Sequence, residues 1–185
     1  MKSSRALKTA LGRIGAVALA GRAVRLVDEE WSSCDDVVSG VGAYLSGGRY
    51  NAPKSFCAVY LTENAQVGLA EVAYPLSAGG SFDLNGAARL TVVPVSFKLL
   101  RVLDLCDYRV RIALGTDRDE ILQDFGLYEA RGVLAPTQTL GKVAYRMGWS
   151  AIKYPSKHEP AVCNLVVFPG NLRKGEYLRP QKPKR

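Results

Sequence analysis

The chain has 185 residues, of which 48% are hydrophobic and 23% charged, a composition typical of one globular domain with a sizeable core. Its formal net charge of +8 comes from the two ends: residues 1–25 contain six basic and no acidic residues, and residues 171–185 contain six basic residues and one acid. The chain between them carries 13 basic and 16 acidic residues. This balance argues against a nucleic-acid-binding body, which would carry a basic stripe of its own.

The cysteines and the single histidine are too scattered for a typical structural zinc site. The four cysteines stand at positions 34, 57, 106 and 163, no two form a CxxC pair, and the only histidine is His158. Zinc ligands usually come in close pairs, so we expect no metal site. The same scatter gives no disulfide framework, and we therefore expect a reducing, cytoplasmic location.

The first half of the chain is predicted to form two helices and two strands around a glycine-rich loop. In chain order they are a basic amphipathic helix Arg5–Ala20, a strand Ala23–Val27, the loop Ser39–Ala52, a buried strand Cys57–Thr62 and a helix Ala65–Tyr74. Asn64 is suited to cap the second helix, and Pro75 helps to end it.

The second half alternates strands and helices without a regular repeat. The predicted elements are β-rich runs Leu90–Lys98 and Val102–Leu105, short helices Asp107–Leu114, Asp117–Phe125 and Gln138–Met147, and strands Ala151–Tyr154 and Cys163–Phe168. This irregular order favours an α+β fold. We divide the chain into a basic N-terminal helix (1–21), one central domain (22–170) and a basic C-terminal tail (171–185) that we expect to be flexible.

A lone carboxylate marks the candidate site. Glu71 is the only formally charged residue between Glu63 and Asp83, on a helix that is otherwise apolar. Burying such a carboxylate is costly unless a cation or hydrogen-bond donors meet it. Arg49, on the preceding glycine loop, is the natural candidate to pair with Glu71 or to share an anionic ligand with it.

Three further polar residues interrupt strand-like or apolar segments. Arg25 could simply end a strand, Tyr60 could be an ordinary core aromatic, and Ser156 could open a turn after a proline. Each residue has this ordinary explanation when taken alone. Taken together with the arginine and the glutamate above, they make a set that could hold a phosphate and a ribose.

The residue types restrict the chemistry. The sequence has no GxxxxGK[ST] phosphate loop, no GxGxxG opening a helix, and no histidine in an expected nucleophile–base arrangement. A carboxylate, arginines, a tyrosine and a serine suit substitution at an anomeric carbon that carries a good leaving group, because a carboxylate stabilises an oxocarbenium-like transition state and arginine neutralises phosphates. Loss of nicotinamide from the ribose of NAD is a reaction of this kind.

Four motifs in order resemble those of the RES domain, from about residue 25 to residue 169. They are GAYLSGGRYN (42–51), AVYLT (58–62), LAEV (69–72) and YPS (154–156). RES proteins are mostly toxins of bacterial toxin–antitoxin pairs, with a fold similar to ADP-ribosyltransferase toxins. Members degrade NAD by hydrolysis or phosphorolysis, and some ADP-ribosylate proteins. Their antitoxin is usually a helix-turn-helix protein that covers the active-site opening.

The resemblance implies roles for the charged residues. Arg49 matches the family arginine and would contact the NAD phosphates, and Arg25 matches an early arginine that would join this phosphate site. Glu71 matches the family glutamate and would stabilise the ribosyl cation or grip its hydroxyls. We expect Glu71, Arg49 and Ser156 to be the catalytic residues.

The resemblance also implies roles for uncharged residues. Tyr60 matches the tyrosine that ends the strand before the glutamate helix, where its ring would stack on nicotinamide. Tyr50 stands where the family commonly has tryptophan and keeps an aromatic ring at the NAD-binding position. Ser156 matches the family serine and would orient the nicotinamide ribose.

The expected function is therefore that of a toxin cleaving the nicotinamide–ribose bond of NAD, with no other cofactor and with inorganic phosphate as an optional co-substrate. Arginine-directed ADP-ribosyltransferases have a second acid two residues before the glutamate, and Leu69 stands there instead, which argues for water or phosphate as the acceptor. Protein ADP-ribosylation stays open as an alternative. A non-catalytic module that binds nucleic acid or protein through the basic ends is a third possibility. The expected partners are NAD and a helix-turn-helix antitoxin, with no membrane and no nucleic acid except through that antitoxin.

Overall fold

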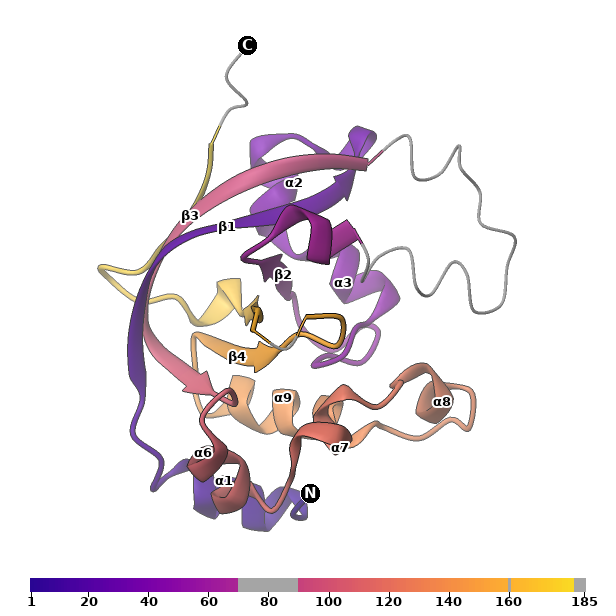
Figure 1. Cartoon of the computed structure of the whole chain (residues 1–185), viewed down its shortest axis with the longest axis vertical. Helices are drawn as coiled ribbons and strands as arrows, with labels where there is room; N and C mark the ends of the chain where they lie inside the picture. Colours follow the sequence, from indigo (N-terminus) through magenta and orange to yellow (C-terminus); the bar gives the residue numbers. More distant parts are fainter. Residues whose placement is uncertain (70–89, 160, 182–185) are drawn as a thin grey trace.

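The computed structural model describes residues 1–69, 90–159 and 161–181, which form a curved sheet with helices at its two ends (Figure 1). The strands are β1 (Val17–Asp28), β2 (Val59–Thr62), β3 (Leu90–Asp104), β4 (Ala151–Pro155), β5 (Cys163–Val167) and β6 (Tyr177–Pro180). Their order is β1-β2-β5-β4-β3-β6, and β3 also pairs with β1. The pairings therefore close β1 to β5 into a ring, with β6 attached outside it.

The long β1–β3 ribbon forms one side of this ring. The two strands pair antiparallel from Leu19 opposite Leu99 to Asp28 opposite Leu90. Along β3, the alternate residues Val93, Val95, Phe97 and Leu99 are buried, as expected for a strand with one face on the core. Only β3 and β4 are parallel among the described strand pairs.

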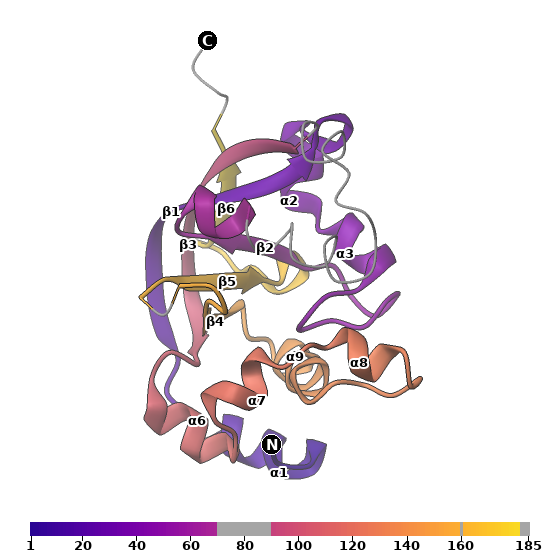
Figure 2. The same ribbon diagram turned by 45° about the vertical axis from the view of Figure 1, so that its right-hand side comes forward.

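The helices lie in two groups on either side of the short strands (Figures 1 and 2). Their bounds are α1 (Ser4–Leu11), α2 (Cys34–Ser39), α3 (Val41–Ser46), α6 (Tyr108–Leu114), α7 (Arg118–Leu122), α8 (Gly126–Glu129) and α9 (Pro136–Arg146), with short 3-10 turns at Glu29–Trp31 and Pro169–Asn171. Residues 65–69 are also helical. Across the described ranges, no helix combines the length and apolar character needed to cross a bilayer.

Among the described residues, two apolar clusters fill the interior. One, which includes Leu7, Leu140 and Trp149, joins α1 and α9 to the sheet. The other, which includes Val95 and Val167, lies against β1, β2 and β3. Together they make the single α+β domain that the irregular order of elements predicts.

Several predicted elements differ from the structure. The loop predicted over Ser39–Ala52 contains the helix α3, and the helix predicted over Asp117–Phe125 ends at Leu122. The helix predicted over Arg5–Ala20 ends at Leu11, and Val17 already begins β1, because hydrogen bonding to β3 outweighs the helix propensity of the alanines. The runs Leu90–Lys98 and Val102–Leu105 are one continuous strand, β3. Part of the expected flexible tail forms β6, where Leu178 packs against the sheet cluster.

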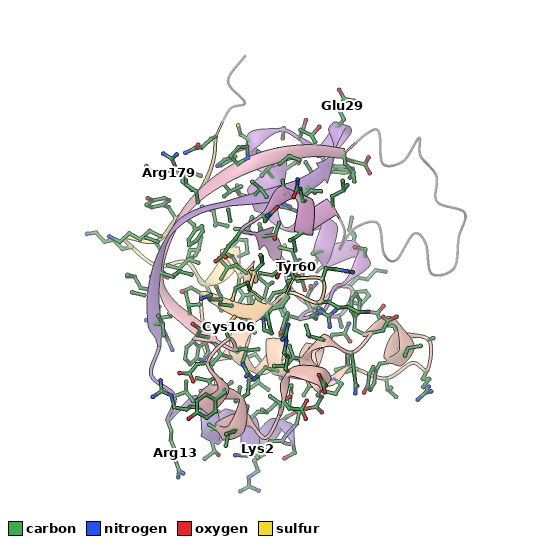
Figure 3. The ribbon with its side chains drawn as sticks, in the orientation of Figure 1. Lys2, Arg13, Glu29, Tyr60, Cys106 and Arg179 are labelled. Carbon is green, nitrogen blue, oxygen red and sulfur yellow. The ribbon has the colours of Figure 1, made fainter. Side chains whose placement is uncertain are left out.

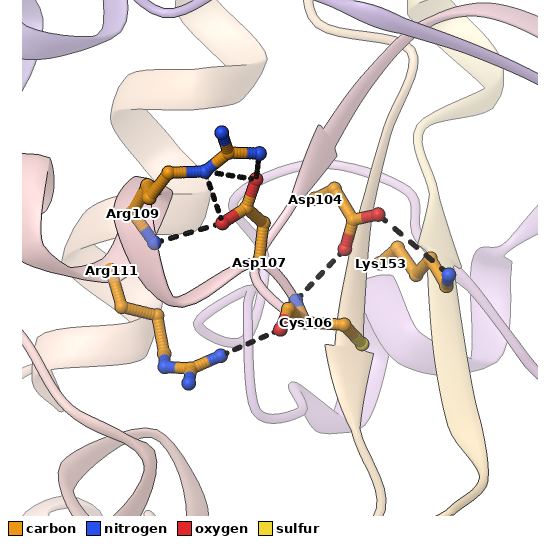
Figure 4. Close-up of polar contacts among 6 residues, drawn as sticks. All are labelled: Asp104, Cys106, Asp107, Arg109, Arg111 and Lys153. Carbon is orange, nitrogen blue, oxygen red and sulfur yellow. Dashed lines mark hydrogen bonds and ion pairs between the residues drawn. The ribbon is translucent and has the colours of Figure 1, made fainter.

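The end of β3 turns directly into α6 through side-chain caps (Figure 4). The Asp104 carboxylate accepts a hydrogen bond from the Cys106 N–H at 2.8 Å and lies 3.7 Å from the Lys153 ammonium. Asp107 accepts from the Arg109 N–H at 2.9 Å, which caps α6, and the Arg109 guanidinium lowers the pKa of this carboxyl. These contacts fix the direction in which α6 leaves the sheet.

Helix α9 approaches the backbone of the glycine loop closely. A Cβ added at Gly141 would lie 1.8 Å from the Tyr50 carbonyl oxygen, so only glycine fits at this contact. Gly42 on α3 is the opposite case, because a Cβ added there would have nothing within 4 Å.

We expect Gly141→Ala to lower the free energy of unfolding by about 3 kcal/mol, because the added methyl group must displace backbone atoms of the glycine loop. Gly42→Ala, with open space around it, should leave stability equal or raise it by up to about 1 kcal/mol. Denaturant unfolding of both variants measures the difference. Equal stabilities would show that α9 does not press on the loop.

Candidate functional site

A cavity of about 510 Å³ opens where the glycine loop, β2 and the β4–β5 turn meet. Two residues of the predicted site, Arg49 and Tyr60, lie in its wall. Gly68, from the helix at 65–69, also lies there. A second hollow of about 540 Å³ beside Met1 and α7 contains none of the predicted residues. The first cavity is therefore the candidate active site.

Arg49 joins the glycine loop to the segment after α7. Its Nη1 donates hydrogen bonds of 2.7 Å to the carbonyl oxygens of both Ile121 and Gln123, and its guanidinium lies 5.7 Å from the centre of the Phe125 ring. Among the described residues, Nη1 is the only guanidinium nitrogen of Arg49 with a hydrogen-bond partner. The N–H groups of Nη2 and Nε therefore remain available for an anionic ligand.

Tyr60 fastens the glycine loop to β2 and lies near the middle of the molecule (Figure 3). Its hydroxyl accepts a hydrogen bond from the Tyr50 N–H at 2.9 Å and donates one to Asn51 Oδ1 at 2.8 Å. Burial raises the pKa of this phenol well above its usual value, so the hydroxyl stays protonated and keeps both bonds. The Tyr60 ring, rather than its hydroxyl, is left to contact a ligand.

Two glycines let the loop pass close to its neighbours. Gly47 has a φ of 78°, and a Cβ there would lie 2.7 Å from the Pro53 ring. A Cβ at Gly48 would lie 2.7 Å from the Tyr60 hydroxyl oxygen. The buried Gln138 side chain then holds the loop from α9, since its Nε2 donates to the Gly48 carbonyl at 3.2 Å.

Ser156 is completely buried and does not form part of the cavity wall. Its Oγ accepts hydrogen bonds from the N–H groups of His158 at 3.2 Å and Glu159 at 3.4 Å, and its own N–H donates to the Val162 carbonyl at 2.9 Å. These contacts shape the β4–β5 turn, whose Lys157 and His158 do line the cavity. The predicted Ser156 is therefore buried beneath the turn that forms part of the cavity wall.

The structure does not bring Arg25 and Tyr50 to the cavity. Arg25 alternates along β1 with Val24 and Leu26, which line the cavity, so its side chain leaves the opposite face and donates to the Val37 carbonyl. Burial lowers the pKa of this guanidinium. Tyr50 is completely buried in the core, with its ring centre 4.8 Å from that of Tyr154.

The predicted catalytic Glu71 lies outside the described residues. The nearest described wall residue in sequence is Gly68, and a Cβ there would meet Leu26 and Thr62 at 2.6 Å. The helix at 65–69 therefore lies directly against β1 and β2 at the cavity. Leu69, the residue two positions before the glutamate, is exposed.

Several wall residues were given no role by the sequence prediction, although Tyr154 belongs to the Tyr-Pro-Ser motif: Asp124, Phe125, Tyr154, Lys157, His158 and Asn164. Asp124 and Phe125 come from the segment after α7, which no motif marks. The sequence could have indicated Lys157 and His158, because these two residues directly follow the Tyr-Pro-Ser motif. The described residues include no group of three or more histidine, cysteine, aspartate or glutamate side chains that could hold a metal ion.

The arrangement suits a ligand that is both anionic and aromatic. Arg49 and Lys157 are cationic, Asp124 is the one carboxylate among the described wall residues, and Tyr60, Phe125 and Tyr154 supply rings. Cations neutralise phosphates and aromatic rings stack on flat heterocycles. A nucleotide bearing a planar base would use both kinds of group.

Comparison with known proteins gives a family and a fold. The family model of the RES domain matches residues 22–185, which includes β6. Proteins named NAD(+) phosphorylase MbcT, from Mycobacterium bovis and from Mycobacterium tuberculosis strain H37Rv, are 39% identical over 92 residues, covering 48% of this chain and 48% of each relative. The match thus spans about half the length of these curated relatives.

A solved structure extends the likeness to nearly the whole chain. In the crystal structure of the M. tuberculosis MbcT–MbcA toxin–antitoxin complex, one chain matches with a TM-score of 0.73 and 24% sequence identity. The match covers 96% of this chain and 90% of that chain. At this identity, the likeness establishes a shared fold.

We expect Tyr60→Phe to lower the free energy of unfolding by about 1–3 kcal/mol, since it removes one acceptor and one donor and leaves the Tyr50 N–H and Asn51 Oδ1 without their partner. Tyr108→Phe is a matched control, because Tyr108 is exposed on α6. Chemical denaturation of both variants measures the difference. A Tyr60→Phe protein as stable as the control would contradict the fastening role of the hydroxyl.

Proposed function

Because the chain belongs to the RES domain family, we propose that it is a toxin enzyme that cleaves NAD at the bond between nicotinamide and ribose. The observation that carries this proposal is the cavity of about 510 Å³, whose wall combines Arg49, the Tyr60 ring and Gly68, three positions before Glu71. The name of the curated relatives, NAD(+) phosphorylase, supports the same reaction.

In the proposed mechanism, the nicotinamide nitrogen takes the electron pair of the breaking bond and leaves as a neutral molecule. Positive charge then develops on the ribose, and the Glu71 carboxylate stabilises it. Arg49 uses its remaining N–H groups on the pyrophosphate, while Nη1 stays on the two backbone carbonyls. The Tyr60 ring contacts the nicotinamide.

We propose supporting roles for Ser156, Arg25 and Tyr50, which do not line the cavity among the described residues. We propose that Ser156 acts through the β4–β5 turn, whose backbone N–H groups of His158 and Glu159 its hydroxyl accepts. Arg25 supports α2 through the Val37 carbonyl, and Tyr50 supports the core beneath the glycine loop. The proposed substrate contacts therefore come from other residues.

Phosphate is the proposed acceptor. The curated relatives are named as phosphorylases, and the exposed Leu69 cannot activate an incoming side chain as a second acid would. Transfer to protein would therefore lack a base at that position.

A protein partner is the second part of the proposal. The matching solved structure is a toxin–antitoxin complex, and exposed leucines stand next to cavity residues in sequence: Leu45, 56% exposed, precedes Ser46, and Leu127, 60% exposed, follows closely after Phe125. We propose that a helix-turn-helix antitoxin covers these side chains in the cytoplasm. We also propose that the fold is of the ADP-ribosyltransferase type.

We expect the purified protein to release nicotinamide from NAD, and Glu71→Gln to lower kcat by at least about 100-fold, since the charge that stabilises the ribosyl cation is lost. Glu29→Gln, at an exposed acid on the 3-10 turn after β1, is the matched control. A chromatographic assay of nicotinamide measures both variants. Equal rates in Glu71→Gln and wild type would overturn the mechanism, and label from NAD recovered on protein would favour ADP-ribosyl transfer.

Arg49→Lys should raise the KM for NAD by about tenfold, because lysine keeps the charge but cannot bind the carbonyls of Ile121 and Gln123 and the pyrophosphate at once. Steady-state kinetics at varied NAD provides the measurement, and thermal unfolding shows how much of the change is structural. Arg146→Lys, at an exposed arginine on α9, is the control. An unchanged KM would remove Arg49 from the substrate site.

A further inference from the structure

The β4–β5 turn supplies the cavity with a second source of positive charge. Lys157 and His158 lie in the cavity wall, and both come from this turn, whereas Arg49 comes from the glycine loop. No motif carried over from the family includes either residue. Among the described wall residues, the cationic side chains of Arg49 and Lys157 therefore come from different elements of the chain.

Hydrogen bonds hold the backbone of the turn that carries these two exposed side chains. The buried Ser156 caps it through the N–H groups of His158 and Glu159, and the Val162 N–H closes it by donating to the Glu159 carbonyl at 3.0 Å. Arg118 on α7 adds a contact from outside, with its Nη2 donating to the Ser156 carbonyl at 3.4 Å. A turn with this many backbone contacts presents both side chains from a fixed backbone, so less conformational entropy of the backbone is lost on binding.

The proposed phosphorolysis needs two anion sites at once. The pyrophosphate of NAD takes one, and the inorganic phosphate that attacks the ribose takes the other. Arg49 keeps only Nη2 and Nε for anions, because its Nη1 already donates to two carbonyl oxygens, and the proposed mechanism assigns these remaining groups to the pyrophosphate. We propose that Lys157 and His158 bind the inorganic phosphate, and this inference rests on the proposed cleavage of NAD.

The chemistry of the acceptor agrees with this placement. An oxygen of monohydrogen phosphate forms the new bond to the ribosyl carbon while the carbon–nitrogen bond breaks and its electron pair leaves with nicotinamide. The product is ADP-ribose carrying a phosphate on that carbon. No base is needed, because the attacking oxygen is already unprotonated, whereas water would have to lose a proton. A lysine ammonium and a histidine N–H are suited to bind and orient the dianion.

The test uses nicotinamide release, with inorganic phosphate varied at saturating NAD and then NAD varied at saturating phosphate. Lys157→Gln and His158→Gln should each raise the KM for phosphate by about tenfold, and the KM for NAD by less than about threefold. The product should shift from ADP-ribose phosphate towards ADP-ribose. Lys142→Gln, at an exposed lysine on α9 outside the cavity wall, is the matched control and should behave as wild type.

Lys157→Arg separates binding from folding, because it keeps the charge and should keep a KM for phosphate close to that of wild type. If the KM for NAD of the glutamine variants rises as much as their KM for phosphate, the inference is overturned. The turn would then bind the pyrophosphate of NAD instead. Nicotinamide release that wild type carries out at the same rate without phosphate would overturn the inference and the proposed phosphate acceptor, and would leave the proposed cleavage of NAD standing. Absence of nicotinamide release by folded wild type would overturn the proposed function as well.

Discussion

The hydroxyl of Tyr60 makes the contact on which the site depends, because it fastens a glycine-rich loop to the central sheet. It accepts from the backbone of Tyr50 and donates to Asn51, and its burial keeps it protonated. The glycine loop can lie this close only because Gly48 has no side chain at the point where it passes the tyrosine. Arg49, between these anchored residues, is thereby held at the cavity, and α9 supports the same loop from behind.

The cavity combines groups from segments far apart in the sequence, and backbone contacts hold them there. Arg49 is held by carbonyls of the segment after α7, and the β4–β5 turn is held by Ser156 and Arg118. Because the carbonyls that hold Arg49 are neutral, they fix its position without cancelling its charge. A dinucleotide and a phosphate are ligands that would use such a charge.

Helices and strands with a strong hydrophobic pattern were predicted from the sequence. The prediction failed where pairing between distant strands determines the secondary structure. The capped helix α6 was predicted closely, and the apolar runs of β3 were predicted as strand although they form one strand and not two. Part of β1 was mistaken for helix, because its alanines and leucines also fit a helical pattern. Motif matching found Arg49 and Tyr60 in the cavity wall. It could not show that Arg25 leaves β1 on the opposite face, since strand register depends on pairing with β2 and β3. Motif matching did not identify Lys157 and His158 as cavity residues, because no motif includes them.

The most direct measurement is a crystal structure with an NAD analogue whose nicotinamide ribose has carbon in place of the ring oxygen, so that the oxocarbenium cannot form. We expect its pyrophosphate against the free N–H groups of Arg49, its nicotinamide on the Tyr60 ring, and the Glu71 carboxylate beside the ribose. An analogue bound outside this cavity, or inside it with the ribose far from Glu71, would contradict the proposed cleavage of NAD at this site.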